Sequence, residues 1–170
     1  MRLGIAAALF LAAGGAAIAQ HQHNQTPYAG LQQRPIKALS EQQVSDLRAG
    51  RGMGLALAGE LNGYPGPVHV LELTDQLQLT AQQRQRVREL FDAMKAEAIP
   101  VGEKLLAQES SLDRAFAERK IETATLASLT AQIGETQGQL RAIHLKYHLT
   151  TAELLTEPQR HRYAELRGYR

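Results

Sequence analysis

Two histidines stand four residues apart in the segment His144-Leu145-Lys146-Tyr147-His148. On a helix this spacing places both imidazoles one turn apart on the same face, where both can reach a single metal ion. If Ile143 and Tyr147 face a partner helix, the two histidines lie on the exposed flank of that contact. The spacing alone leaves two interpretations open: a transition-metal site, or two solvated histidines on a helix surface.

Two imidazoles alone bind a metal weakly, so a complete site needs further ligands. Ni(II), Cu(II), Co(II) and Zn(II) are the ions that suit imidazole, and no organic cofactor is indicated. His21 and His23 could chelate Cu(II) or Ni(II) together with a free N-terminal amine, or could simply belong to a solvated tail. The candidate ligands elsewhere in the chain, besides a second copy of it, are His161, His69, Glu153 and Met53.

Nothing in the sequence resembles a catalytic set. The chain has no Cys, no G-x-S-x-G elbow and no H-E-x-x-H motif. The segment Gly50-Arg51-Gly52-Met53-Gly54 lacks the Gly-Lys-Ser/Thr ending of a phosphate-binding loop, and its glycine spacing fits a helix-packing stripe better. Since no nucleophile, base and orienting group can be proposed together, we expect a protein that is not an enzyme.

The elements that would position the histidines are marked by two related pentads, Leu79-Thr80-Ala81-Gln82-Gln83 and Leu155-Thr156-Glu157-Pro158-Gln159. In each pentad a Thr is followed three residues later by a Gln, which is the spacing of a capping box. Each pentad therefore predicts a helix start, and Ser40-Glu41-Gln42-Gln43 predicts a third.

Between the pentads the apolar residues follow a heptad pattern on both sides of a turn near residues 119–123. The pattern predicts an all-α fold: a long antiparallel helical hairpin with coiled-coil packing and short flanking helices. Apolar residues such as Leu90, Leu106 and Leu149 lie off the hairpin contact, so we expect a second copy of the chain to cover some of them. The predicted helices span about residues 40–61, 69–77, 80–119, 123–155 and 157–168.

The N-terminal residues predict export. Met1-Arg2-Leu3, an apolar run and Ala17-Ile18-Ala19 have the form of a secretory signal peptide, residues 1–19. We expect a disordered N-terminal arm over residues 20–38 and one helical domain over residues 39–170, with no transmembrane segment after cleavage. The formal net charge is only +2 and the charges are interspersed, which argues against nucleic acid as a partner.

An exported, Cys-free helical chain with Leu-Thr-x-x-Gln at the start of a long helix and again near its end resembles the Spy/CpxP family, over about residues 71–170. This family is related to periplasmic heavy-metal sensor and resistance proteins. The resemblance implies a four-helix chain that forms a cradle-shaped homodimer. It also implies a role in the envelope stress or heavy-metal response, with a membrane-bound signalling partner, or as an ATP-independent chaperone for unfolded envelope proteins. The pair His144 and His148 is similar to the histidine-bearing helix of the metal-sensing branch.

Overall fold

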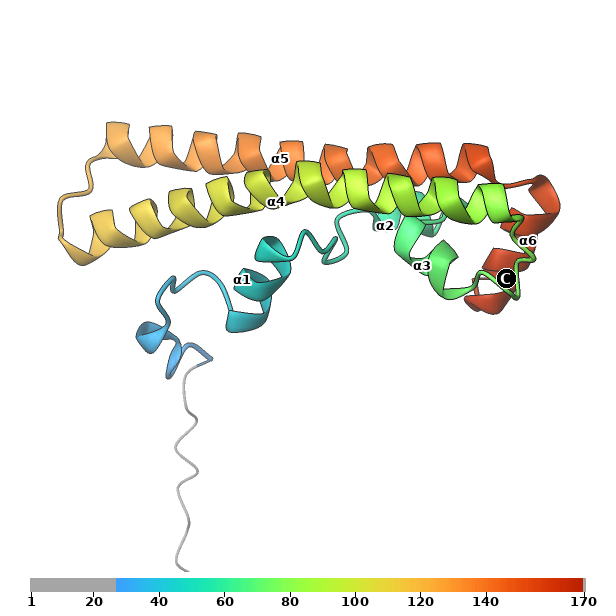
Figure 1. Cartoon of the computed structure of the whole chain (residues 1–170). Helices are drawn as coiled ribbons and strands as arrows, with labels where there is room; N and C mark the ends of the chain where they lie inside the picture. Colours follow the sequence, from blue (N-terminus) through green and yellow to red (C-terminus); the bar gives the residue numbers. More distant parts are fainter. Residues whose placement is uncertain (1–26, 170) are drawn as a thin grey trace, which may run out of the picture.

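A computed structural model describes residues 27–169, and all the regular structure in this part of the chain is helical. Two long helices, α4 (Ala81–Ala117) and α5 (Thr123–Leu154), pack side by side as an antiparallel hairpin (Figure 1). The shorter helices lie along one side of this hairpin, and α6 (Glu157–Leu166) folds back at its open end. The predicted all-α fold with a long hairpin is therefore confirmed.

All three predicted capping boxes are present. Ser40 caps α1 (Glu41–Arg48), Thr80 caps α4 and Thr156 caps α6. At each start the hydroxyl accepts a hydrogen bond from the amide of the Gln three residues on, and that Gln side chain accepts one from the capping residue's amide. These bonds satisfy amides that have no partner inside the helix.

The prediction of one helix over residues 40–61 is wrong. The chain instead forms α1, an irregular turn and the short helix α2 (Leu57–Glu60). Gly50 ends α1 with φ +64°, and the bonds from Gly50 N to Leu47 O and from Arg51 N to Asp46 O complete a Schellman motif. Because a left-handed residue cannot continue a helix, the glycines from Gly50 to Gly54 lie in a turn and form no packing stripe along one helix.

Two further boundaries differ from expectation. The described part of the predicted arm, residues 27–38, contains a 3₁₀ turn (Leu31–Gln33), and its Lys37 Nζ lies 2.9 Å from Asp113 Oδ2 on α4. Ile36 packs against the core, so this part of the arm is ordered, contrary to the predicted disorder. The helix expected over residues 69–77 is α3 (Pro67–Glu72), which is followed by turns up to the first pentad.

The core is divided into two clusters along the hairpin. One lies where α1 crosses α4 and includes Leu47, Ala98 and Leu140. The contact is close: a Cβ on Gly102 of α4 would lie 2.6 Å from the carbonyl oxygen of Leu47. The other cluster joins both pentads with α3 and α6 and is centred on Val70, Val87 and Tyr163. Between these clusters, α2 and the turns around it cover the middle of α5.

Within residues 27–169, no helix is both long enough and apolar enough to cross a membrane. The predicted signal peptide lies outside the described residues.

Candidate metal site

His144 and His148 lie one turn apart on α5, as the sequence predicts, but the exposed flank expected for them is wrong. The two residues are only 2% and 9% exposed. The segment from Gly52 to Gly66, here called the covering segment, lies against both rings. A Cβ on Gly52 would lie 3.4 Å from His144 Nδ1, and one on Gly66 would lie 2.7 Å from His148 Nε2. Glycines in the covering segment therefore allow it to approach the imidazoles closely.

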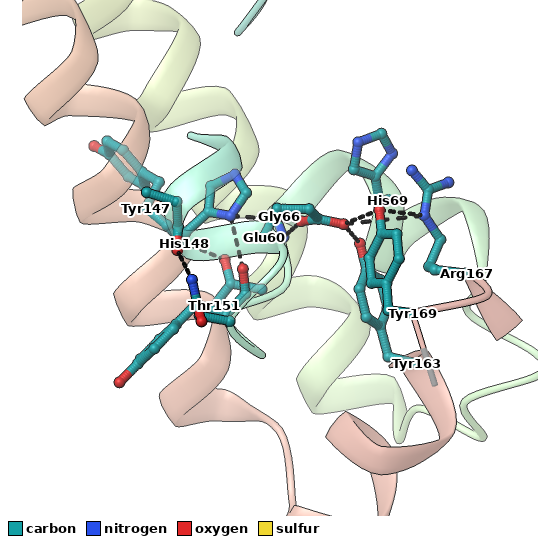
Figure 2. A network of polar contacts seen from close by, with 12 residues as sticks. Glu60, Gly66, His69, Tyr147, His148, Thr151, Tyr163, Arg167 and Tyr169 are labelled. Atoms are coloured by element: carbon teal, nitrogen blue, oxygen red, sulfur yellow. Dashed lines mark hydrogen bonds and ion pairs between the residues drawn. The ribbon is translucent and has the colours of Figure 1, made fainter. Parts of the chain in front are cut away.

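His148 is oriented by groups from α2 and the turn that follows it (Figure 2). Its Nδ1 lies 2.7 Å from the carbonyl oxygen of Tyr64 and 3.6 Å from Glu60 Oε2. A carbonyl can only accept a hydrogen bond, so in this contact Nδ1 carries the proton and donates it. The lone pair is then on Nε2, the arrangement found when a histidine ligates a metal and its other nitrogen is hydrogen-bonded to a carbonyl or carboxylate.

His144 is the residue with an unmet bonding requirement. Its Nε2 is buried and has no hydrogen-bond partner. Burial lowers the pKa of His144 below its ordinary value of 6.5, and the charge of His148 lowers this pKa further. A buried polar atom without a partner is costly, and a neutral imidazole is the form that binds a metal. These properties fit a metal ligand.

A cavity of about 520 Å³ adjoins both imidazoles. Its lining comes from three parts of the chain. These are the turn after α1 together with α2 and α3, the α4 segment around Met94, and the turn of α5 from His144 to His148, here called the histidine turn. Met53, His69 and Glu60 are also among the residues that line this cavity. Within residues 27–169, however, there is no group of three or more His, Cys, Asp or Glu side chains placed to hold one metal ion.

The other predicted ligands are distributed differently. His69 lines this cavity, where its Nδ1 lies 3.2 Å from Glu72 Oε2. His161 lies on α6 and lines a separate cavity, together with Glu153. His21 and His23 lie outside the described residues.

Glu60 is the functional candidate that sequence reasoning missed. It is 5% exposed, and Figure 2 shows its carboxylate between the histidine turn and the C-terminal helix. Oε2 accepts a hydrogen bond from Gly66 N at 3.1 Å, and Oε1 accepts from the hydroxyls of Tyr163 and Tyr169. Burial, and after it the hydrogen bond to Glu60, raise the pKa of Tyr163 strongly above its ordinary value. A sequence signal existed: Glu60 is the only charged residue from Gly52 to Val68.

The caps predicted at the pentads also make a long-range contact. Besides their capping bonds, Gln83 and Gln159 hydrogen-bond to each other and to the last turn of α5 and the segment before α4. The apolar residues of the pentads, Leu79 and Leu155, are both buried in the second core cluster. The pentads therefore close the open end of the hairpin next to the histidine turn.

Comparison with known proteins agrees with the resemblance carried by the pentads. A family model described as heavy-metal resistance matches residues 54–162, from the turn before α2 to the middle of α6. No curated protein and no solved structure gives a significant match. The matched segment is well over half of the chain and contains both histidines, Glu60 and both pentads. The protein therefore belongs to the heavy-metal resistance family.

Proposed function

We propose that the protein is a non-catalytic periplasmic metal-binding protein of a heavy-metal or envelope-stress response. It holds a transition-metal ion in the cavity between α2 and α5, through His144 and His148. The observation that carries this proposal is the buried Nε2 of His144, which has no hydrogen-bond partner, in a residue that lines one cavity together with a second imidazole. A metal ion would supply the missing partner of that nitrogen.

The surroundings of the pair support ligation. Tyr64 and Glu60 orient His148, so its ring needs little reorganisation before it binds a metal. Glu60 also places one carboxylate beside the site, which offsets part of the charge of a cation. The family match supports a heavy-metal-related role for the protein.

The direct test is calorimetric titration of the chain from Gln20 to Arg170 with Zn(II), Ni(II), Co(II), Cu(II) and Cu(I). We expect binding with a dissociation constant below ~100 μM for at least one ion, and a loss of at least about tenfold in His144→Ala and His148→Ala. His161→Ala is the matched control, since His161 lines a different cavity. Because His144→Ala empties a buried position, His144→Gln should be measured as well, with circular dichroism to confirm folding. Equal affinities in all variants would rule out this site.

A chaperone function is the second candidate, and an exposed apolar surface favours it. We call this surface the α2 patch; it consists of Met53, Leu57, Leu61, Tyr64 and Leu149, which are between 40% and 57% exposed. Leu61, Tyr64 and Leu149 border a cavity of about 740 Å³ next to α6. Exposed apolar side chains gathered in this way are typical of surfaces that bind other proteins, including unfolded chains or a second copy.

The chaperone candidate is tested by light scattering from a reduced, unfolded client protein. The wild-type chain should suppress aggregation near a stoichiometric ratio, and Leu57→Ser/Leu61→Ser should suppress it less. Ala58→Ser, a change at an exposed α2 position outside the patch, is the control. No suppression at a several-fold excess of the wild-type chain would count against this candidate. Sedimentation of the same samples tests the predicted homodimer.

A further inference from the structure

Both internal methionines of this protein line the cavity that holds the two histidines. The sequence has three Met residues, of which one is Met1. The other two, Met53 and Met94, come from distant parts of the chain, and both border the cavity next to His144 and His148. The only thioether donors available after the first residue are therefore gathered at one place.

The two thioethers enter from different elements. Met94 is on α4, is 5% exposed and faces the cavity across from α5. Met53 is at the turn between Gly52 and Gly54, has a left-handed φ of +46° and is 40% exposed. An exposed methionine in a backbone conformation that L-residues rarely adopt gains nothing from core packing. Met94 thus brings a buried thioether to the cavity lining, and Met53 brings an exposed one.

The donor chemistry of this cavity is soft. In the described part of the chain no third His, Cys, Asp or Glu joins the two imidazoles to complete a harder donor set. Thioether sulfur is polarisable and favours Cu(I) and ions like it, whereas Ni(II), Co(II) and Zn(II) are held better by several nitrogen and oxygen donors. Cu(I) and Ag(I) also accept low coordination numbers, which suits a site with one imidazole nitrogen and two sulfurs.

The charges around the cavity favour a monovalent ion. Lys95 and Arg51 both line it, with Arg51 Nε paired to Asp46 Oδ1 at 2.5 Å, and Glu60 is its one carboxylate. Repulsion from the Lys95 ammonium group is about half as large for a monovalent ion as for a divalent one at the same position.

From these observations we propose that the cavity is a soft-metal site, in which His144 Nε2 and the sulfur atoms of Met94 and Met53 bind Cu(I) or Ag(I) in preference to divalent ions. His148, oriented by Tyr64 and Glu60, is the fourth available donor. This inference rests on the proposed function, since it names the class of metal for the same site.

The test compares soft and divalent ions on methionine variants. The wild-type chain, Met94→Leu, Met53→Leu and the double variant are titrated with Ag(I), with Cu(I) in competition with a chromogenic Cu(I) chelator, and with Zn(II) and Ni(II). Leucine keeps the apolar volume and removes the sulfur, so folding should be retained. We expect the double variant to lose at least about tenfold in affinity for Ag(I) and Cu(I), with the affinities for Zn(II) and Ni(II) unchanged.

A spectroscopic readout separates ligation from packing. With ¹³C-labelled methionine methyl groups, Ag(I) should shift the signals of both Met53 and Met94 at one equivalent, and His144→Gln should weaken this response. If the wild-type chain binds Zn(II) or Ni(II) but neither soft ion, or if the methionine variants bind Ag(I) as well as the wild type does, the soft-metal inference is overturned and the proposed function stands. If no ion binds, both are overturned.

Discussion

The side-chain amides of Gln83 and Gln159 bind each other in both directions. Gln83 Nε2 donates to Gln159 Oε1 at 2.9 Å, and Gln159 Nε2 donates to Gln83 Oε1 at 3.1 Å. The same two oxygens accept the capping amides of Thr80 and Thr156. Each amide also reaches a backbone carbonyl, that of Leu154 or Leu77. The duplicated pentad is therefore one structural unit, in which two helix starts are joined through their capping residues.

This pairing predicts strong coupling between the two glutamines. Gln83→Ala and Gln159→Ala should each lower the free energy of unfolding by about 1–2 kcal/mol, because each removes a cap and leaves the other amide without its partner. In a double-mutant cycle measured by urea unfolding, the two losses should deviate from additivity by at least about 0.5 kcal/mol. Gln82→Ala, at an exposed neighbouring position, is the control. Strictly additive losses would show that the two amides do not interact in solution.

The hydroxyls of the same caps make a separate contribution. Replacing Thr80 or Thr156 by Ala should cost roughly 1 kcal/mol each, since the Gln amide three residues on loses its acceptor. Thr→Ser at the same positions keeps the hydroxyl and should cost much less. Urea unfolding compares the four variants, and alanine variants as stable as the wild type would contradict the capping role.

Replacing glycine by alanine should have opposite effects on stability at different positions of the hairpin. Gly102→Ala should destabilise the protein by about 1–3 kcal/mol, despite the better helix propensity of Ala, because the new methyl group would push against the Leu47 carbonyl and displace α1. Gly134→Ala and Gly138→Ala on α5 add a methyl group where no atom outside the local helix backbone lies within 4 Å. These two changes should stabilise α5 by up to about 1 kcal/mol each. Thermal unfolding gives the sign of each effect, and a stabilising Gly102→Ala would mean that α1 does not pack closely there.

The buried imidazole predicts a pH dependence of the metal-free protein. The pKa of His144 is lowered by burial, so between that pKa and its ordinary value of 6.5 the unfolded chain binds more protons than the folded chain. The free energy of unfolding should therefore fall as the pH drops below 6.5, and this contribution should level off below the folded pKa. Urea unfolding at a series of pH values measures the slope, and His144→Leu should flatten it. An NMR titration that places the His144 pKa at or above 6.5 would contradict the prediction.

Glu60 should hold the C-terminal helix against the rest of the fold. Glu60→Gln keeps the shape of the side chain but turns an amide NH₂ group toward hydrogen-bond donors. It should therefore lower the free energy of unfolding by about 1–3 kcal/mol. Amide hydrogen exchange should then quicken in α6 more than in the middle of α4. Tyr163→Phe removes one donor to Glu60 and should act in the same direction, whereas Glu153→Gln, at an exposed carboxylate, should change neither quantity. Unchanged exchange in α6 would show that the carboxylate does not anchor it.

The sequence by itself determined the features that depend on nearby residues. Capping boxes at Ser40, Thr80 and Thr156 involve residues three apart, and the heptad pattern that predicts the hairpin repeats every seven. The placement of His144 and His148 on one helix face follows from the same periodicity. Gly50 is also a local signal for the end of α1, but the glycine spacing from Gly50 to Gly54 fits a packing stripe on one continuous helix equally well.

Only the tertiary structure decided what covers these elements. The burial of the histidines depends on glycines about 80 to 90 residues earlier in the chain, and Glu60 meets Tyr163 and Tyr169 across more than 100 residues. The joining of Met53 and Met94 in one cavity with His144 depends on the turn that interrupts the first predicted helix. Local periodicity indicates which face of a helix is apolar, but not which distant segment packs on it. That choice follows from close packing of the whole chain, and here it turned an expected surface pair of histidines into a buried site.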